Sequence, residues 1–309
     1  MLLLSLAGLF LASQLIARSI EKEFPPIGSV VSINGSKLHF MDMFVEAQKE
    51  QPVVVFIHGA SGNLRDALTV YRDKLNGRVR ALYLDRPGHG YSEPFDGSND
   101  PKAQANAIAG LLDYLEIKQA ILVGHSFGGV IATAFGVLHR DKTAGLILLA
   151  PVSHPWYTGV DWHYDVANLP VLGWLFSNTF APTGGSLIYP KAVKKVFAPN
   201  PMPADYKETS GTRLVLRPSN FYENAKDVAR VHDHVADFHP RYKEIQAPTF
   251  IYHGDRDDIV SLEIHSINGL SQDIESAQLN ILEGVGHKPD YIAAEKVVAD
   301  IVSLVKSAE

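Results

Sequence analysis

The sequence contains no cysteine. Disulfide bonds, thiolate catalysis and cysteine-based metal sites are therefore excluded, although this absence leaves the redox compartment open. The chain also has no run of Lys and Arg, and its formal net charge is −6. Because nucleic-acid binding requires a basic patch, we expect no nucleic-acid partner. Neither a Walker loop nor a dinucleotide-binding glycine pattern occurs, so we expect no cofactor.

Charged residues are missing from the first 17 positions as well. An apolar helix of about 19 residues measures roughly 28 Å, close to the hydrocarbon thickness of a bilayer. We favour an uncleaved membrane anchor for residues 1–22. The alternatives are a cleaved signal peptide, which would leave a secreted or periplasmic protein, and a buried helix. A signal peptide usually begins with basic residues, which are absent here, and Ala17-Arg18-Ser19 is a poor cleavage site.

A short linker follows this segment, because Pro25-Pro26 breaks the helix. The residues to which we assign chemistry all lie beyond this linker. Deleting residues 1–22 is therefore expected to release a soluble and fully active protein. Arg18 and Lys22 favour a cytoplasmic position for the rest of the chain by the positive-inside rule, although two neighbouring glutamates dilute that signal.

Beyond residue 27, expected strands alternate with expected helices. Asn34-Gly35 is typical of a tight hairpin, and the later apolar runs are typical of strands buried on both faces. The expected strands are 29–33, 37–45, 52–57, 80–84, 120–123, 144–150, 248–252 and 277–282, and the expected helices are 64–75, 101–115, 130–138 and 293–305. This alternation predicts an α/β fold with a doubly wound, mostly parallel sheet.

Residues 152–246 interrupt the alternation. They contain all three tryptophans and many prolines, and no clear strand. We therefore predict a helical cap at 152–246, inserted into a core made of residues 27–151 and 247–309. Some of the aromatic side chains of the cap should line an apolar acyl pocket. His232, His234 and His239 also lie here, and we interpret them as a solvated helix end and not as a metal site.

The sequence around Ser126 carries the strongest chemical signal. Residues 121–129 read Ile-Leu-Val-Gly-His-Ser-Phe-Gly-Gly, an apolar strand followed by G-x-S-x-G. In this pattern a buried strand turns sharply into a helix, and Gly124 and Gly128 let the two pass closely. The turn strains the serine and lifts its hydroxyl above the sheet, which makes Ser126 the candidate nucleophile. The N–H of Phe127 is then free to donate to an oxyanion.

A serine nucleophile needs a base and a residue that orients the base. His287 follows the last expected strand, on a glycine-containing loop that can reach across the sheet, so we assign it as the base. The acid is expected among Asp255, Asp257 and Asp258, which crowd together after the preceding strand. Spacing alone does not choose among the three, although Asp257 would face back towards Ser126.

A second oxyanion donor should come from the loop after the first parallel strand. His58-Gly59 ends that strand, so the Ala60 N–H is the predicted partner of the Phe127 N–H. His58 and His125 lie close to this predicted site, and we interpret them as packing or orienting residues.

Four motifs occur in an order that resembles the α/β-hydrolase superfamily over about residues 27–307. They are His58-Gly59, Asp85-x-x-Gly88-x-Gly90-x-Ser92, Gly124-His125-Ser126-Phe127-Gly128-Gly129, and Gly254-x-x-Asp257 together with Gly286-His287. The resemblance implies the α/β-hydrolase fold, a mainly structural Asp85 loop, and an acid three residues after a glycine, which selects Asp257. The N-terminal segment, its proline linker and residues 213–228 resemble more loosely a membrane-anchored bacterial subgroup.

The superfamily's dehalogenases and epoxide hydrolases have aspartate where this chain has Ser126, so the resemblance implies acyl transfer. We expect a serine hydrolase of carboxylic esters, acting on a small-molecule or lipid-like ester without a metal ion. His287 would take the proton of Ser126, Asp257 would hold the imidazole, and water would hydrolyse the acyl-enzyme. The alternatives are hydrolysis of another acyl or C–C bond by the same residues, and a ligand-binding protein on a hydrolase scaffold.

Overall fold

The computed structural model describes residues 2–44, 46, 50–157, 159 and 162–308. The other positions, which include Val45 in a predicted strand and residues 158, 160 and 161 in the predicted cap, lie outside the described residues.

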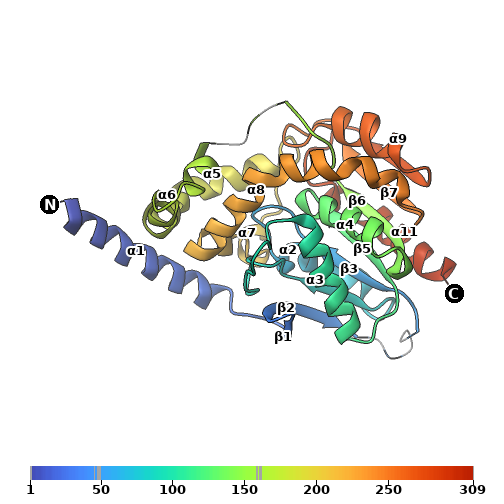
Figure 1. Ribbon diagram of the computed structural model, residues 1–309, viewed down its shortest axis with the longest axis horizontal. Helices are drawn as coiled ribbons and strands as arrows, with labels where there is room; N and C mark the ends of the chain where they lie inside the picture. The colour runs from blue at the N-terminus through green and yellow to red at the C-terminus, as the bar shows by residue number, and fades with distance from the viewer. Residues whose placement is uncertain (1, 45, 47–49, 158, 160–161, 309) are drawn as a thin grey trace.

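Eight strands form one sheet in the order β1-β2-β4-β3-β5-β6-β7-β8 (Figure 1). The antiparallel pairs are β1 with β2 and β2 with β4, and all other neighbours are parallel. The strands are β1 (Ser29–Ile33), β2 (Ser36–Met43), β3 (Val53–Ile57), β4 (Ala81–Leu84), β5 (Ala120–His125), β6 (Thr143–Leu149), β7 (Thr249–Gly254) and β8 (Ala277–Leu282). The predicted α/β fold with a mostly parallel sheet is confirmed.

Helices cover both faces of the sheet. On β3, Val53, Val55 and Ile57 pack with α3 (Pro101–Tyr114) and α4 (Phe127–Leu138). The alternate residues, Val54 and Phe56, pack with α2 (Leu64–Leu75) and α11 (Ala294–Ser307). The predicted core also contains the short helices η2 (Arg140–Lys142), η5 (Glu263–Leu270), α9 (Ser271–Asp273) and α10 (Pro289–Ile292). Because side chains alternate between the faces of a strand, a fully apolar run such as β3 needs cover on both sides.

The described residues between 152 and 246 are helical and contain no strand. The long helices are α6 (Leu172–Phe197) and α8 (Pro218–Phe238), which contact each other. The shorter ones are α5 (Trp162–Ala167), α7 (Tyr206–Thr209), η3 (Thr212–Leu216) and η4 (His239–Glu244). The division of the chain into a core and an inserted cap agrees with this helical content and stays a prediction.

The N-terminal helix α1 (Leu2–Glu23) is long and apolar enough to cross a membrane, a criterion that signal sequences and core helices also meet. It lies beside α6 (Figure 1). Ile20 and Phe24 are 0% and 2% exposed, and they share a buried cluster with Tyr189 and Phe197 of α6. The sequence led us to expect a segment separate from the fold, whereas the C-terminal half of this helix is part of the packed structure.

This packing changes the expected outcome of deleting residues 1–22. The deletion should lower the melting temperature by about 5 °C or more, since it removes Ile20 and leaves its apolar partners exposed, at about 1.5–3 kcal/mol for each large buried side chain. Deleting only residues 1–12, which keeps the buried half of α1, is the matched control and should leave the melting temperature nearly unchanged. Differential scanning fluorimetry in detergent compares the two, and equal stability of both deletions would contradict the packing argument.

Candidate active site

Ser126 lies at the tip of the turn between β5 and α4. Its φ of 53° and ψ of −116° are rare for a residue with a side chain and cost on the order of 1–3 kcal/mol. A Cβ on Gly124 would clash with Gly128 O, and one on Gly128 would clash with Ile57 O. Glycine is therefore required at both positions. The α-helix begins at Phe127, directly after the turn as the G-x-S-x-G motif indicates, and three residues before the apolar run that starts at Val130.

Asp257 and His287 meet across the ends of β7 and β8. The distance from His287 Nδ1 to Asp257 Oδ2 is 2.7 Å, and the Asp257 side chain is fully buried. Asp257 Oδ1 accepts the N–H groups of Ile259 and Val260 at 2.8 and 2.9 Å. Burial favours the neutral acid, but the attraction of His287 and the hydrogen bonds from His253, His287 and the Val260 N–H outweigh it and hold the pKa of Asp257 below its usual range.

The carboxylate fixes the tautomer of His287. Asp257 can only accept, so Nδ1 carries the proton and Nε2 keeps a lone pair. The His287 ring lies 5.0 Å from the ring of His125, and His125 Nε2 donates to the His287 carbonyl at 2.8 Å. His287 is thus brought beside the residue that precedes Ser126. Within the described residues, no hydrogen bond joins the Ser126 hydroxyl to His287, a common situation in sites without substrate.

The predicted oxyanion donors also lie at the turn. Phe127 is the first residue of α4, so its N–H has no partner within the helix. The N–H of Ala60 follows Gly59, and a Cβ on Gly59 would lie 3.0 Å from the Cβ of Ser126. In the part of the chain that the structure describes, neither N–H donates a hydrogen bond. Two unpaired donors therefore lie on segments next to Ser126.

The orientation of the Ala60 N–H is set by the contacts of Gly59 O, the carbonyl oxygen of the same peptide unit. A peptide unit is planar, so whatever holds Gly59 O also fixes the direction of the Ala60 N–H. His58 Nδ1 donates to Gly59 O at 2.8 Å and Arg86 Nη2 does so at 3.4 Å. Burial and the nearby Arg86 charge lower the pKa of His58 well below its usual value, so the ring stays neutral. The expectation of an orienting role for His58 agrees with these contacts.

Arg86 connects both predicted donors to α8. Its guanidinium stacks on the Phe127 ring at 4.5 Å, and its Nη1 donates to Asp227 of α8 at 2.6 Å. Burial raises the pKa of Asp227 to about 6, against the opposing effect of Arg86. A second link joins α8 to the loop that carries Ala60, since the Ser61 N–H donates to Asn224 Oδ1 at 2.6 Å. Helix α8 therefore holds the loop that carries Ala60.

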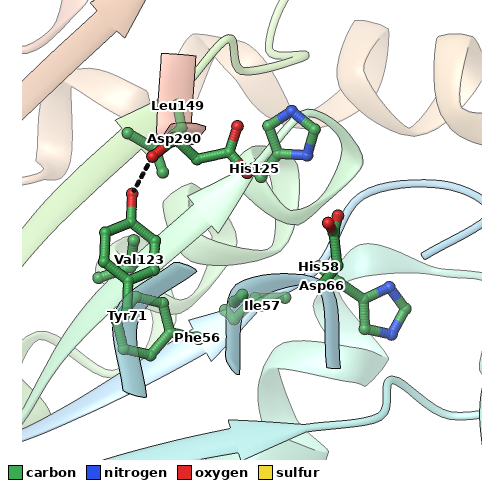
Figure 2. Close-up of a pocket in the computed structure, with 10 residues that line it drawn as sticks. Phe56, Ile57, His58, Asp66, Tyr71, Val123, His125, Leu149 and Asp290 are labelled. Atoms are coloured by element: carbon green, nitrogen blue, oxygen red, sulfur yellow. Dashed lines mark hydrogen bonds between the residues drawn. The ribbon is translucent and has the colours of Figure 1, made fainter. Parts of the chain in front are cut away.

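A buried ionic cluster lies behind His287. Figure 2 shows the pocket that Asp66, His125 and Asp290 line, where these residues bring possible metal-ligating atoms within 4.8 Å of one another. Lys288 donates to Asp66 and to Asp290, at 2.9 Å each. Burial favours a neutral amine, but the two carboxylates raise the pKa of Lys288. The cluster therefore holds its own cation, and we assign it no metal.

Arg86, Asp227 and Lys288 were not singled out in the sequence. Asp85 does have the expected structural role, accepting the Leu64 N–H at 2.8 Å and contacting His39 Nδ1 at 2.7 Å. Arg86 follows it directly in that motif, which was a usable signal. Arg86 and Asp227 are 141 positions apart in the chain, and no sequence pattern predicts that they pair.

Comparisons with known proteins show the family to which this fold belongs. Residues 54–301 match the model of the alpha/beta hydrolase family. A 91-residue stretch is 42% identical to a 2-hydroxymuconate semialdehyde hydrolase of Pseudomonas sp. (strain CF600), but it covers only 28% of this chain and 32% of that protein. The 2-hydroxy-6-oxononadienedioate/2-hydroxy-6-oxononatrienedioate hydrolase of Paraburkholderia xenovorans (strain LB400) is 25% identical over 84% of this chain and 87% of its own.

Among solved structures, a membrane phospholipase A described as a bacterial virulence factor superposes with a TM-score of 0.71. The two sequences are 21% identical, and the match covers 98% of this chain and 92% of the other. At that identity the likeness concerns the fold alone. Because the family match extends over most of the sheet, the turn at Ser126 and the loop of His287, the chain belongs to the alpha/beta hydrolase family.

Proposed function

We propose that this protein is a serine hydrolase of carboxylic esters that forms an acyl-enzyme. The observation that carries the proposal is the Asp257–His287 hydrogen bond of 2.7 Å beside the strained turn of Ser126. A fully buried carboxylate held against an imidazole leaves Nε2 as a base. A binding protein has no need of such an arrangement together with two unpaired N–H donors.

In the proposed reaction, His287 Nε2 accepts the Ser126 proton as Oγ attacks the ester carbonyl. The N–H groups of Ala60 and Phe127 stabilise the negative oxygen of the tetrahedral intermediate. His287 then gives its proton to the leaving alcohol, and the acyl group stays on Ser126. Water, activated by the same imidazole, attacks the acyl-enzyme and releases the acid.

The named relatives keep a second candidate open, the hydrolysis of another acyl or C–C bond by the same residues. The substrate in the name of the Paraburkholderia relative is a dioate, so it carries two carboxylates that need cations. Within the described residues, two buried cations near the predicted site are Arg86, which stacks on Phe127, and Lys288, which follows His287, and each is paired with protein carboxylates. This pairing favours an ester without anionic ends over a dicarboxylate.

We also propose that α1 is retained and holds the protein at a membrane. Cleavage near residue 20 would remove apolar side chains that pack on α6 and η3, and with them the partners of a buried cluster. The packing therefore favours the retained helix over the signal peptide, whose cleavage would leave a secreted or periplasmic protein. A membrane position gives a lipid-like ester as the natural class of substrate.

Two measurements test the proposed function. A fluorophosphonate probe should label the full-length protein at Ser126, and the label is located by mass spectrometry after proteolysis. A series of p-nitrophenyl esters should then be hydrolysed, with a preference that changes when Trp156 is replaced by Ala, because the predicted cap sets the acyl pocket. Labelling without ester turnover, together with hydrolysis of a dienedioate, would favour the second candidate.

Arg86 and Asp227 are expected to support the oxyanion donors. The double variant Arg86→Gln/Asp227→Asn removes both charges together, so it leaves no buried ion unpaired. We expect kcat to fall by about 10- to 100-fold, less than the roughly 10²–10³ that follows outright loss of a donor. The KM should change little, because the Ala60 N–H matters most when the oxyanion forms. Steady-state kinetics with a short ester measures both.

The control is a similar ion pair elsewhere. Arg80, which directly precedes β4, and Asp42 of β2 form a two-point pair, at 3.2 and 2.7 Å. The variant Arg80→Gln/Asp42→Asn should lose comparable stability without the loss of kcat. If kcat follows the melting temperature equally in both double variants, the role of Arg86 is merely structural.

A further inference from the structure

Helices α1 and α6 place two uncharged stretches side by side. Residues 2–17 of α1 and 172–190 of α6 contain no Asp, Glu, Lys or Arg. Phe10, near the middle of α1, stacks on Trp174 near the start of α6, with ring centroids 6.3 Å apart. Ile20 and Tyr189 share a buried cluster near the other end. The two helices therefore run in the same direction, and their uncharged stretches overlap, with the first residues of α1 extending beyond the start of α6.

Both helices of this pair expose large apolar side chains. Leu11 and Leu15 of α1 are 63% and 65% exposed, and Leu187 and Ile188 of α6 are 84% and 64% exposed. Together with Leu4 and Trp174, these residues form what we call the apolar face. A soluble surface rarely leaves so many large apolar side chains open to water, so the face needs a partner.

Three hydroxyl groups of α6 are satisfied within the helix. Thr179 donates to Leu175 O at 2.6 Å, and Thr183 donates to Thr179 O at 2.8 Å. Ser186 donates to the carbonyl four residues before it, at 2.6 Å. Hydroxyls that bond to their own helix need no water, which is how polar residues are tolerated in helices surrounded by lipid.

Basic residues mark the end of the uncharged stretches on both helices. Arg18 and Lys22 follow on α1, and Lys191, Lys194 and Lys195 follow on α6, all of them exposed. None of the five makes an ion pair within the described residues. The neighbouring glutamates are neutralised instead, because Glu21 pairs with Arg217 and Glu23 with Arg213. On α1 and α6 themselves, the charges left without an ion pair at this border are therefore positive.

We infer that the apolar face is embedded in a phospholipid bilayer, with the five basic side chains at the level of anionic phosphates. The inference extends the membrane position proposed for α1, on which it rests, to α6 of the predicted cap. The length also fits, since 19 helical residues of α6 span about 28 Å, near the hydrocarbon thickness. Cations at the rim of an apolar surface match the anionic surface of a bilayer. A protein partner would not require the basic side chains of both helices to lie at one height along the helix pair.

Tryptophan fluorescence in vesicles tests this inference. The full-length protein carries Ser126→Ala, so that lipids stay intact and the result does not depend on the proposed hydrolysis. One variant keeps only Trp174 (Trp156→Phe, Trp162→Phe), and the other keeps only Trp156 (Trp162→Phe, Trp174→Phe), which packs against the main core. Both are reconstituted into phosphatidylcholine–phosphatidylglycerol vesicles with brominated acyl chains. We expect at least twofold quenching of Trp174 and no quenching of Trp156.

Two further variants separate the bilayer from other occupants. Leu187→Glu/Ile188→Glu should reduce the quenching of Trp174, whereas Ile281→Glu, an exposed apolar position of β8, should not. If Trp174 stays unquenched while α1 resists extraction by carbonate, only α1 enters the membrane and the inference is overturned. It is equally overturned if the unquenched protein is a dimer that Leu187→Glu/Ile188→Glu dissociates, because a second copy then covers the face.

Discussion

Replacing Ser126 with Ala is expected to lower kcat for ester hydrolysis by about 10⁶-fold, because a nucleophile and its base act as a unit. The substitution removes only a hydroxyl from a side chain that is 8% exposed, and the residue keeps the φ of 53° that the turn imposes. The fold should therefore stay intact, and the melting temperature should change little. Initial rates with a p-nitrophenyl ester at high enzyme concentration measure the remaining activity.

Combining Ser126→Ala with His287→Ala tests whether the nucleophile and its base act as a unit. His287→Ala should cost about as much as Ser126→Ala, and combining the two should cost little more than either alone. The histidine variant should also be less stable, because it leaves the buried Asp257 carboxylate without its partner. Near wild-type turnover by Ser126→Ala would rule out an acyl-enzyme on this residue. Additive losses in the double variant would indicate that the two residues act in separate steps.

The parts of the fold that could be predicted from the sequence are those with local signals. The apolar run of β3 and the hairpin at Asn34-Gly35 are specified by neighbouring residues, and both occur as predicted. The apolar run after Ser126 marks its helix only from residue 130, whereas the G-x-S-x-G motif indicates a helix directly after Ser126, and α4 begins at Phe127.

Contacts between distant segments could not be predicted in this way. The composition of residues 1–20 suits a membrane, but the burial of Ile20 depends on α6, about 170 positions later. The choice of Asp257 over its neighbours needed the family resemblance, because all three aspartates fit the spacing. The folded loop distinguishes them directly, since Asp257 is within hydrogen-bond distance of His287 whereas Asp255 accepts the Gly284 N–H at 2.7 Å.

Asp257→Asn should lower kcat by about 10⁴-fold through the tautomer of His287. The carbonyl of the introduced side chain would keep the N–H groups of Ile259 and Val260, which Asp257 Oδ1 accepts at present. The new NH₂ group would then face His287 Nδ1 and donate to it. That nitrogen would have to lose its proton, so Nε2 would carry it and could no longer accept the proton of Ser126.

The neighbouring aspartates provide matched controls for this substitution. Asp255→Asn keeps an oxygen for the Gly284 N–H, and Asp258 is exposed, so both variants should stay within about threefold of wild-type kcat. A crippled Asp255→Asn enzyme with an active Asp257→Asn enzyme would move the acid by two positions.

The pH dependence of stability gives an independent test of Asp257. The pKa of Asp257 is lower in the folded protein than in the unfolded chain, so its charge stabilises the fold above about pH 4. The stability advantage of the wild type over Asp257→Asn should therefore be present at neutral pH and shrink as the pH is lowered, which thermal unfolding at a series of pH values measures.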